Sequence, residues 1–186
     1  MTTSRDPHVF VVDVEDEPGV LTRVSSLFRR RGFNIVSLTV GATERPGVSR
    51  MTIVVDAPDV AARRIETNLW KLVNVIRVED VTAAAAVHRE LVMVKVTADA
   101  EARTHVMKLA EVFRARVIDV APESLILETT GTSDKIAGLL DVLRPFGVLE
   151  VARSGHVAMV RGAQSGPVRT GDADGDIVPD NVSYSV

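Results

Sequence analysis

The chain has 186 residues, of which 46% are hydrophobic, so it is long and apolar enough to form one medium domain or two small ones. Its formal net charge is only −3 and its acidic and basic residues are interspersed, which excludes the basic surface of a nucleic-acid-binding protein, while the absence of cysteine excludes disulfides and cysteine-bound metals. No apolar run reaches the roughly 18 residues that cross a bilayer and residues 1–7 carry no apolar secretion signal, so we expect a cytoplasmic protein that binds neither membrane nor nucleic acid.

Apolar periodicity in the first half of the chain predicts the element order βαββαβ. The expected elements are strand 8–14, helix 18–31, strand 33–40, a turn at 44–47, strand 48–55, a helix that begins at Asp59 and strand 75–81. Helix 18–31 carries its apolar residues on one stripe, which favours packing on a sheet. Gly32 follows it as a stop, and the three arginines before Gly32 complement the negative end of the helix dipole.

The same order repeats after an alanine-rich joint at residues 82–87. The expected elements are strand 90–97, helix 100–114, strands 117–120 and 125–129, helix 133–143 and strand 148–153. We therefore predict an α+β fold of two tandem ferredoxin-like βαββαβ sandwiches, at residues 8–82 and 88–162. Residues 163–186 are rich in Gly, Asp, Ser and Pro, and we expect a flexible tail there.

One face of the first sheet is expected to lie bare, because its helices cover only the other face. Val9, Val11, Ile35 and Val54 lie on strands and cannot all sit beneath the helices. A partner must then shield the remaining apolar side chains. We expect a homodimer.

The segment Asp16-Glu17-Pro18-Gly19-Val20-Leu21 is a candidate receptor for a free amino acid. Pro18 is predicted at the first helical position, and Gly19 beside it leaves the backbone N–H groups of the helix start uncovered, which suits a carboxylate. Asp16 is placed to accept from an ammonium group. The same residues are also an ordinary way to begin a helix, so the pattern alone leaves both interpretations open.

Asn34 follows the end of the same helix, where asparagine is frequent because it tolerates left-handed backbone. It also begins a strand that we expect at the dimer interface. From there its amide is placed to donate to a carboxylate and accept from an ammonium group held by the turn of the neighbouring subunit.

Signals for catalysis are weak. The histidines at positions 8, 88, 105 and 156 are scattered without ligand spacing, so no metal site is expected. Acylphosphatases use a similar fold with an arginine and an asparagine, but Arg23, the counterpart that would pair with Asn34, falls within a predicted helix. RNA-binding βαββαβ domains stack bases on sheet aromatics, and the strands here carry aliphatic residues instead.

The chain resembles the regulatory small subunit of acetolactate synthase, also called acetohydroxyacid synthase. The resemblance covers about residues 8 to 162. It rests on the segments 16–24, 31–35, 37–40, 49–53, 71–73, 75–76, 89–91, 94–96, 118–120, 131–132 and 150–155. It implies that the first unit is an ACT domain, the amino-acid-sensing module of that family, and that the second is the family's C-terminal ferredoxin-like domain.

The resemblance implies regulation and no catalysis by this chain. The family's small subunit activates a large catalytic subunit, which uses thiamine diphosphate, Mg²⁺ and FAD, and confers feedback inhibition by valine, sometimes leucine or isoleucine. No cofactor is expected on this chain. The implied effector site consists of Asp16, Glu17, Pro18, Gly19, Val20 and Leu21 of one subunit with Asn34 and Ile35 of the other. Several relatives carry Asn where Asp16 stands. The charge of Asp16 would strengthen the contact with the ammonium group of the effector and repel the effector's carboxylate.

The second unit has Ala98-Asp99-Ala100 where the first has its acid-Pro-Gly turn, so it repeats the scaffold without the candidate receptor. The alternative is a free-standing amino-acid-responsive module that controls another enzyme or a transcription factor. The loop Gly41–Arg50, the second unit and Trp70 are candidates for the contact with a catalytic partner.

Overall fold

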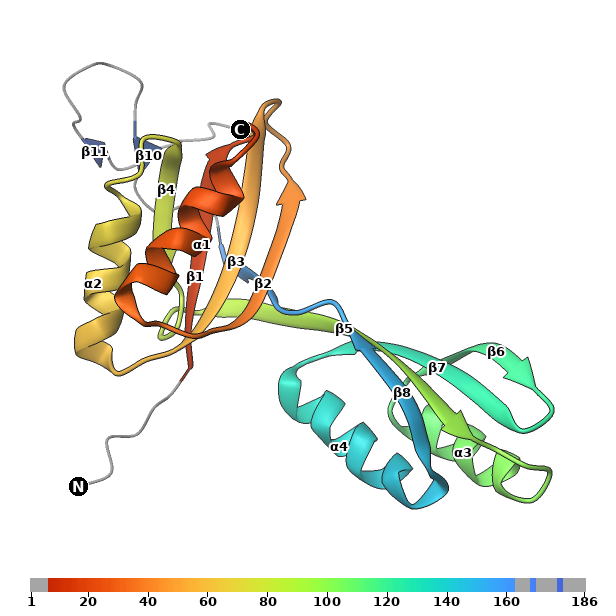
Figure 1. Cartoon of the computed structure of the whole chain (residues 1–186). Coiled ribbons are helices and arrows are strands. Elements are labelled where there is room, and N and C mark those ends of the chain that lie inside the picture. Colours follow the sequence, from red (N-terminus) through yellow and green to blue (C-terminus); the bar gives the residue numbers. More distant parts are fainter. Residues whose placement is uncertain (1–6, 163–167, 170–176, 179–186) are drawn as a thin grey trace, which may run out of the picture. The chain divides into compact units, whose positions relative to one another are not determined.

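The chain folds into two compact units, shown in a computed structural model that describes residues 7–162, 168–169 and 177–178 (Figure 1). The first unit extends to Val87 and resumes at Ala158, and the second comprises His88–Val157. We expected the second unit to continue to residue 162. The last residues of that range instead pack in the first unit, through apolar side chains of a short returning strand. No helix of the described residues is long and apolar enough to cross a membrane.

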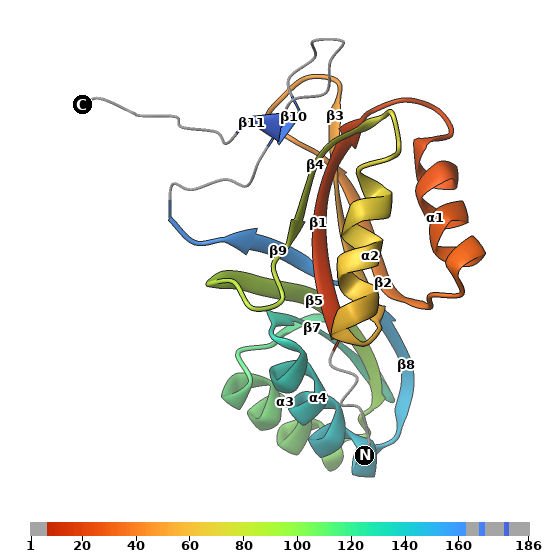
Figure 2. The same cartoon turned by 90° about the vertical axis from the view of Figure 1, so that its left-hand side faces the viewer.

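The first unit has the predicted βαββαβ order. Its elements are β1 (Pro7–Glu15), α1 (Val20–Arg31), β2 (Ile35–Ala42), β3 (Val48–Asp56), α2 (Asp59–Leu69) and β4 (Val75–Asp80). The sheet order is β11-β10-β4-β1-β3-β2 and every neighbouring pair is antiparallel. The added strands β10 (Val168–Arg169) and β11 (Ile177–Val178) lie in the expected tail, whose other residues are outside the described part. Figures 1 and 2 show α1 and α2 side by side on one face.

The core of the first unit lies between its helices and that face of the sheet. Phe10, Val12 and Val14 alternate along β1 and are fully buried against α1 and α2, as the period of two in a strand requires. Val24 and Phe28 come from the apolar stripe of α1. Burial of such a side chain stabilises the fold by about 2 kcal/mol.

The opposite face of the first sheet is covered by the chain itself, which differs from our expectation. Val9, Val11 and Val54 are buried against Val81 and Ala158, the latter on β9 (Val157–Val160). Ile35 lies apart from them and packs against the helix-side core. The sequence could not show this because β9 follows β1 by about 150 residues and is too short to signal its position. Three of the four residues therefore require no partner to shield them.

The second unit repeats the order around its own core. Its elements are β5 (Ala86–Thr97), α3 (Ala102–Val112), β6 (Arg116–Ala121), β7 (Ser124–Gly131), α4 (Ser133–Leu143), the 3₁₀ turn η1 (Arg144–Phe146) and β8 (Val148–Arg153). The sheet order is β6-β7-β5-β8, antiparallel throughout, and β9 also pairs with β5. In both views α3 and α4 cover one face (Figures 1 and 2). The predicted α+β fold of two ferredoxin-like units is thus confirmed.

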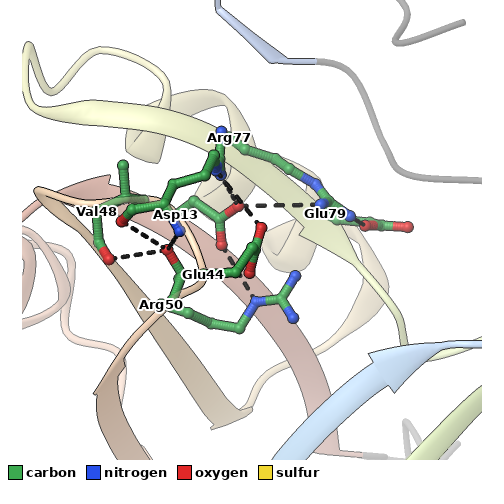
Figure 3. A network of polar contacts seen from close by, with 8 residues as sticks. Asp13, Glu44, Val48, Arg50, Arg77 and Glu79 are labelled. Carbon is green, nitrogen blue, oxygen red and sulfur yellow. Dashed lines mark hydrogen bonds and ion pairs between the residues drawn. The ribbon is translucent and has the colours of Figure 1, made fainter. Parts of the chain in front are cut away.

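A buried carboxylate joins three strands and a turn in the first unit (Figure 3). The side chain of Asp13 is only 3% exposed, and it accepts from Arg45 Nη2 at 2.7 Å and from Arg50 Nε at 3.2 Å. Arg77 Nη1 lies 3.9 Å away, and Arg77 also pairs with Glu79. Because a buried charge is stable only when it is paired, Asp13 fixes the β2–β3 turn against β1.

Replacing Asp13 with asparagine is expected to lower the free energy of unfolding by about 3 kcal/mol, because three guanidinium groups lose their common anion. Urea denaturation measures the change. The matched control is Asp56→Asn, since Asp56 is exposed at the end of β3 and forms no ion pair among the described residues. The control should change stability by less than about 0.5 kcal/mol. Equal effects of the two substitutions would contradict this role for Asp13.

Glu90 is the corresponding buried acid of the second unit. It accepts two hydrogen bonds from Arg153, to Oε1 at 2.7 Å and to Oε2 at 2.6 Å, and is 3% exposed. These bonds hold the pKa of Glu90 below its ordinary value, although burial opposes the shift. Since the folded pKa is the lower one, the pair stabilises the protein above the ordinary glutamate pKa, and this contribution disappears as pH falls through the folded value.

Glu90→Gln is therefore expected to cost about 2 kcal/mol at neutral pH, the value typical of charged hydrogen bonds. The difference from wild type should shrink as pH falls below the ordinary glutamate pKa of about 4.3. Calorimetric unfolding at a series of pH values measures it. Glu123→Gln, in an exposed turn, serves as the control. A difference that stays constant down to acid pH would show that the Arg153 pair is not its cause.

Candidate functional site

The turn between β1 and α1 presents an open helix start. We predicted Pro18 at the first helical position, but α1 begins at Val20 and Gly19 is its N-cap, with a left-handed φ of 88°. The helix cannot extend back through Gly19, because that φ lies outside the right-handed helical region. A Cβ added at Gly19 would meet no atom of the described residues within 4 Å, so the position beside the helix start is open.

Several polar groups of this turn lack a partner. Among the described residues, the backbone N–H groups of Gly19, Leu21 and Thr22 donate to no protein atom, whereas Val20 donates to the carbonyl of Glu17 at 3.3 Å. No side chain caps the helix. Asp16 is exposed, and within the described part of the chain its carboxylate forms no hydrogen bond or ion pair. Unengaged donors at the positive end of a helix thus lie near a free carboxylate, which is the arrangement that a zwitterion requires.

In the second unit, a side chain of the chain itself caps the start of the corresponding helix, α3. Asp99 Oδ1 accepts from the backbone N–H groups of Glu101 at 3.0 Å and Ala102 at 2.8 Å. A carboxylate of the chain therefore occupies the start of α3. No side chain among the described residues takes the corresponding place at the start of α1.

Asn34 and Ile35 lie at the other end of the sheet from this turn. Glu15, beside Asp16, pairs with Val48 at the start of β3, whereas Ile35 pairs with Val55 at the opposite end of that strand. At about 3.4 Å per residue the two ends are roughly 24 Å apart. One protomer therefore does not bring Asn34 to the Asp16 turn. Asn34 is exposed, and Ile35 is partly buried against the helix-side core.

The β2–β3 turn supports the candidate site, a role that our sequence analysis missed. The backbone N–H of Asp16 donates to the carbonyl of Gly47 at 2.8 Å, and Arg45 of the same turn binds the buried Asp13. The turn and the β1–α1 segment are thus joined by two contacts (Figure 3 shows the Asp13 side). The available signal was Asp13, an acid on an otherwise apolar strand face.

Two histidines lie near acids, but neither arrangement is a known catalytic geometry. His8 is buried with Asp59 at 3.3 Å and Asp80 at 3.4 Å, and His156 Nε2 lies 2.7 Å from Ser133 Oγ and 3.9 Å from Glu90. In a serine–histidine–acid relay the serine and the acid contact different ring nitrogens, whereas Ser133 and Glu90 both approach Nε2 of His156. No cluster of three or more candidate metal ligands occurs among the described residues.

The acylphosphatase-like pair is not assembled either. Arg23 lies within α1 and donates to Asn74, while Asn34 follows the far end of that helix. Most of the length of α1, about 1.5 Å per residue, separates them.

Comparisons with known proteins match both units to one enzyme. Residues 10–77 match the family model described as an AHAS small subunit-like ACT domain, and residues 89–162 match the small subunit of acetolactate synthase. The chain is 50% identical to the acetolactate synthase small subunit of Mycolicibacterium smegmatis, over 87% of this chain and 95% of that protein. It is 53% identical to the Mycobacterium bovis small subunit, over 83% of this chain and 92% of that protein.

A solved structure agrees with this assignment. The acetolactate synthase small subunit of Thermotoga maritima matches with a TM-score of 0.78 and 39% identity, over 85% of this chain and 99% of that one. The two family models together lie in both units of the chain. The chain belongs to the family of acetolactate synthase small subunits.

Proposed function

We propose that this chain activates the catalytic subunit of acetolactate synthase and confers feedback inhibition by valine, which binds between the first units of a homodimer. The observation that carries the proposal is the start of α1, where Gly19 leaves three backbone N–H groups without protein partners beside the free carboxylate of Asp16. Thiamine diphosphate, Mg²⁺ and FAD then belong to the catalytic subunit.

The proposed valine contacts follow from charge. The α-carboxylate is held by the N–H groups of Leu21 and Thr22 and by the positive end of the α1 dipole, in the way that Asp99 is held at α3. The ammonium group is held by Asp16. The aliphatic side chain contacts Leu21, which is 45% exposed in one protomer, and Ile35 of the second protomer. Leucine and isoleucine share this chemistry, so they are candidate effectors as well.

A dimer formed through β2 would complete the site. In the described sheet β2 has β3 as its one neighbour, and its Val36 and Val40 are about half exposed. Two-fold pairing of two β2 strands is antiparallel, so the start of one strand lies beside the end of the other. Ala42, at that end, pairs with Ser49 next to the Asp16 side of the sheet. Asn34 of each protomer would then approach the turn of its partner.

Isothermal calorimetry with valine tests the effector site. The wild-type chain should release or absorb heat that saturates at millimolar valine, and Gly19→Asp should abolish it, because a carboxylate then occupies the anion position. The backbone strain of Asp at this φ costs about 1 kcal/mol.

Gly162→Asp is the matched control for that strain, since Gly162 has a φ of 84° and open space around it. It should bind valine as wild type does. No heat with the wild-type chain, or equal loss in both variants, would contradict the assignment.

The dimer is tested by placing charges on the β2 edge. Val36→Asp with Val40→Asp should give monomers in light scattering and should lose valine binding, because Asn34 no longer reaches the partner's turn. Val60→Asp with Val73→Asp is the control, since both valines are more than two-thirds exposed on or after α2. A β2 variant that stays dimeric, or a monomer that binds valine with full affinity, would contradict the site.

A further inference from the structure

The surface is hollowed along α1 and beside the C-terminal end of α2, and the chemistry of this region is distinct from that of the effector turn. Two hollows of about 490 and 380 Å³ adjoin there and share Arg30 and Leu72 in their walls. We call the two together the helix groove. Leu27 and Leu72 supply apolar surface, and Arg29, Arg30, Arg31 and Lys71 supply charge.

The positive charge of the helix groove is not balanced by the part of the chain that the structure describes. None of Arg29, Arg30, Arg31 and Lys71 forms an ion pair with a described residue, and the sequence has no acidic residue between Val20 and Thr43. The dipole of each helix supplies only about half a negative charge at its C-terminal end. Two helix ends thus offset about one of these four cations.

The cations are held together and do not all extend separately into solvent. Asn68 is 9% exposed, and its Oδ1 accepts from Arg31 Nη2 at 3.2 Å and from Lys71 Nζ at 3.4 Å. Its amide donates to the carbonyl of Arg64 at 2.6 Å, which fixes its orientation. Two like charges that share one acceptor repel each other, and an anion bound between them would relieve that repulsion.

The lining favours a polypeptide over other polyanions. The groove contains leucines beside its cations and no aromatic side chain on which bases could stack. Its lining follows α1 from Thr22 to Arg31, about 14 Å at 1.5 Å per residue, which is longer than a single small anion. Acidic side chains spaced along a peptide, with apolar residues between them, match this pattern.

We propose that the helix groove docks an acidic segment of the catalytic subunit. This inference rests on the proposed function, because the family membership of the chain is what supplies that partner. The net charge of the chain is only −3 and its acidic and basic residues are otherwise interspersed, so the unbalanced cations of the helix groove are the feature that attracts an acidic partner. The groove would therefore fix the orientation of the complex.

The test measures binding of the full-length chain to the catalytic subunit by surface plasmon resonance. Arg30→Gln with Lys71→Gln should raise Kd at least about tenfold at about 0.1 M salt, and the difference should shrink at high salt, where the Debye length falls to a few Å. Arg63→Gln with Arg64→Gln removes the same charge from exposed positions of α2 that do not line the groove, and it should stay within about twofold of wild type. Arg30→Lys with Lys71→Arg should preserve binding.

Two results would overturn the inference. Equal weakening by the two glutamine pairs would indicate general attraction and no specific groove. The second result is a groove variant that binds the catalytic subunit with wild-type affinity, which would show that the partner does not dock in the groove.

Valine calorimetry on the same variants separates this inference from the proposed function. The groove variant should bind valine as wild type does. A groove variant that loses partner binding while the wild-type complex shows no activation would support the docking surface and contradict the proposed activation. A wild-type chain that does not bind the catalytic subunit would overturn the docking surface and leave the effector site to its own test.

Discussion

The left-handed backbone at Gly19 is the constraint on which the functional interpretation depends. It stops α1 at Val20 and leaves the first N–H groups of the helix without protein acceptors. Unpaired backbone donors are costly unless water or a ligand satisfies them, so the turn is suited to an exchangeable carboxylate. In the second unit, the side chain of Asp99 permanently accepts from the backbone N–H groups at the start of α3. The proposed binding at α1, and its absence at α3, would thus follow from one difference between two copies of a fold.

Strand direction explains why a single protomer would hold only part of the proposed site. The Asp16 turn and Asn34 flank opposite ends of β3, so no small rearrangement within one chain joins them. A two-fold axis at the β2 edge would bring the Asp16 turn of one protomer to Asn34 of the other. Valine would then bind the assembled pair more tightly than the separate protomers, and a ligand biases an equilibrium by that difference in affinity.

Most of the fold was predictable because its signals are local. The alternation around Phe10 and the stripe containing Phe28 set the strand and helix faces directly. What the sequence could not show depends on distant segments: Ala158 returning to cover Val11, and the arginines that gather around Asp13. The helix start was predicted at Pro18 and lies at Val20, since Gly19 adopts a left-handed φ that propensity alone does not reveal.

The most direct test is the rate of acetolactate formation by the catalytic subunit, measured with this chain, without it, and across a valine titration. We expect the wild-type chain to raise the rate and valine then to lower it. The Gly19→Asp chain should raise the rate equally and leave it insensitive to valine. Inhibition by valine that is unchanged in the Gly19→Asp complex, or no stimulation by the wild-type chain, would contradict the proposed function.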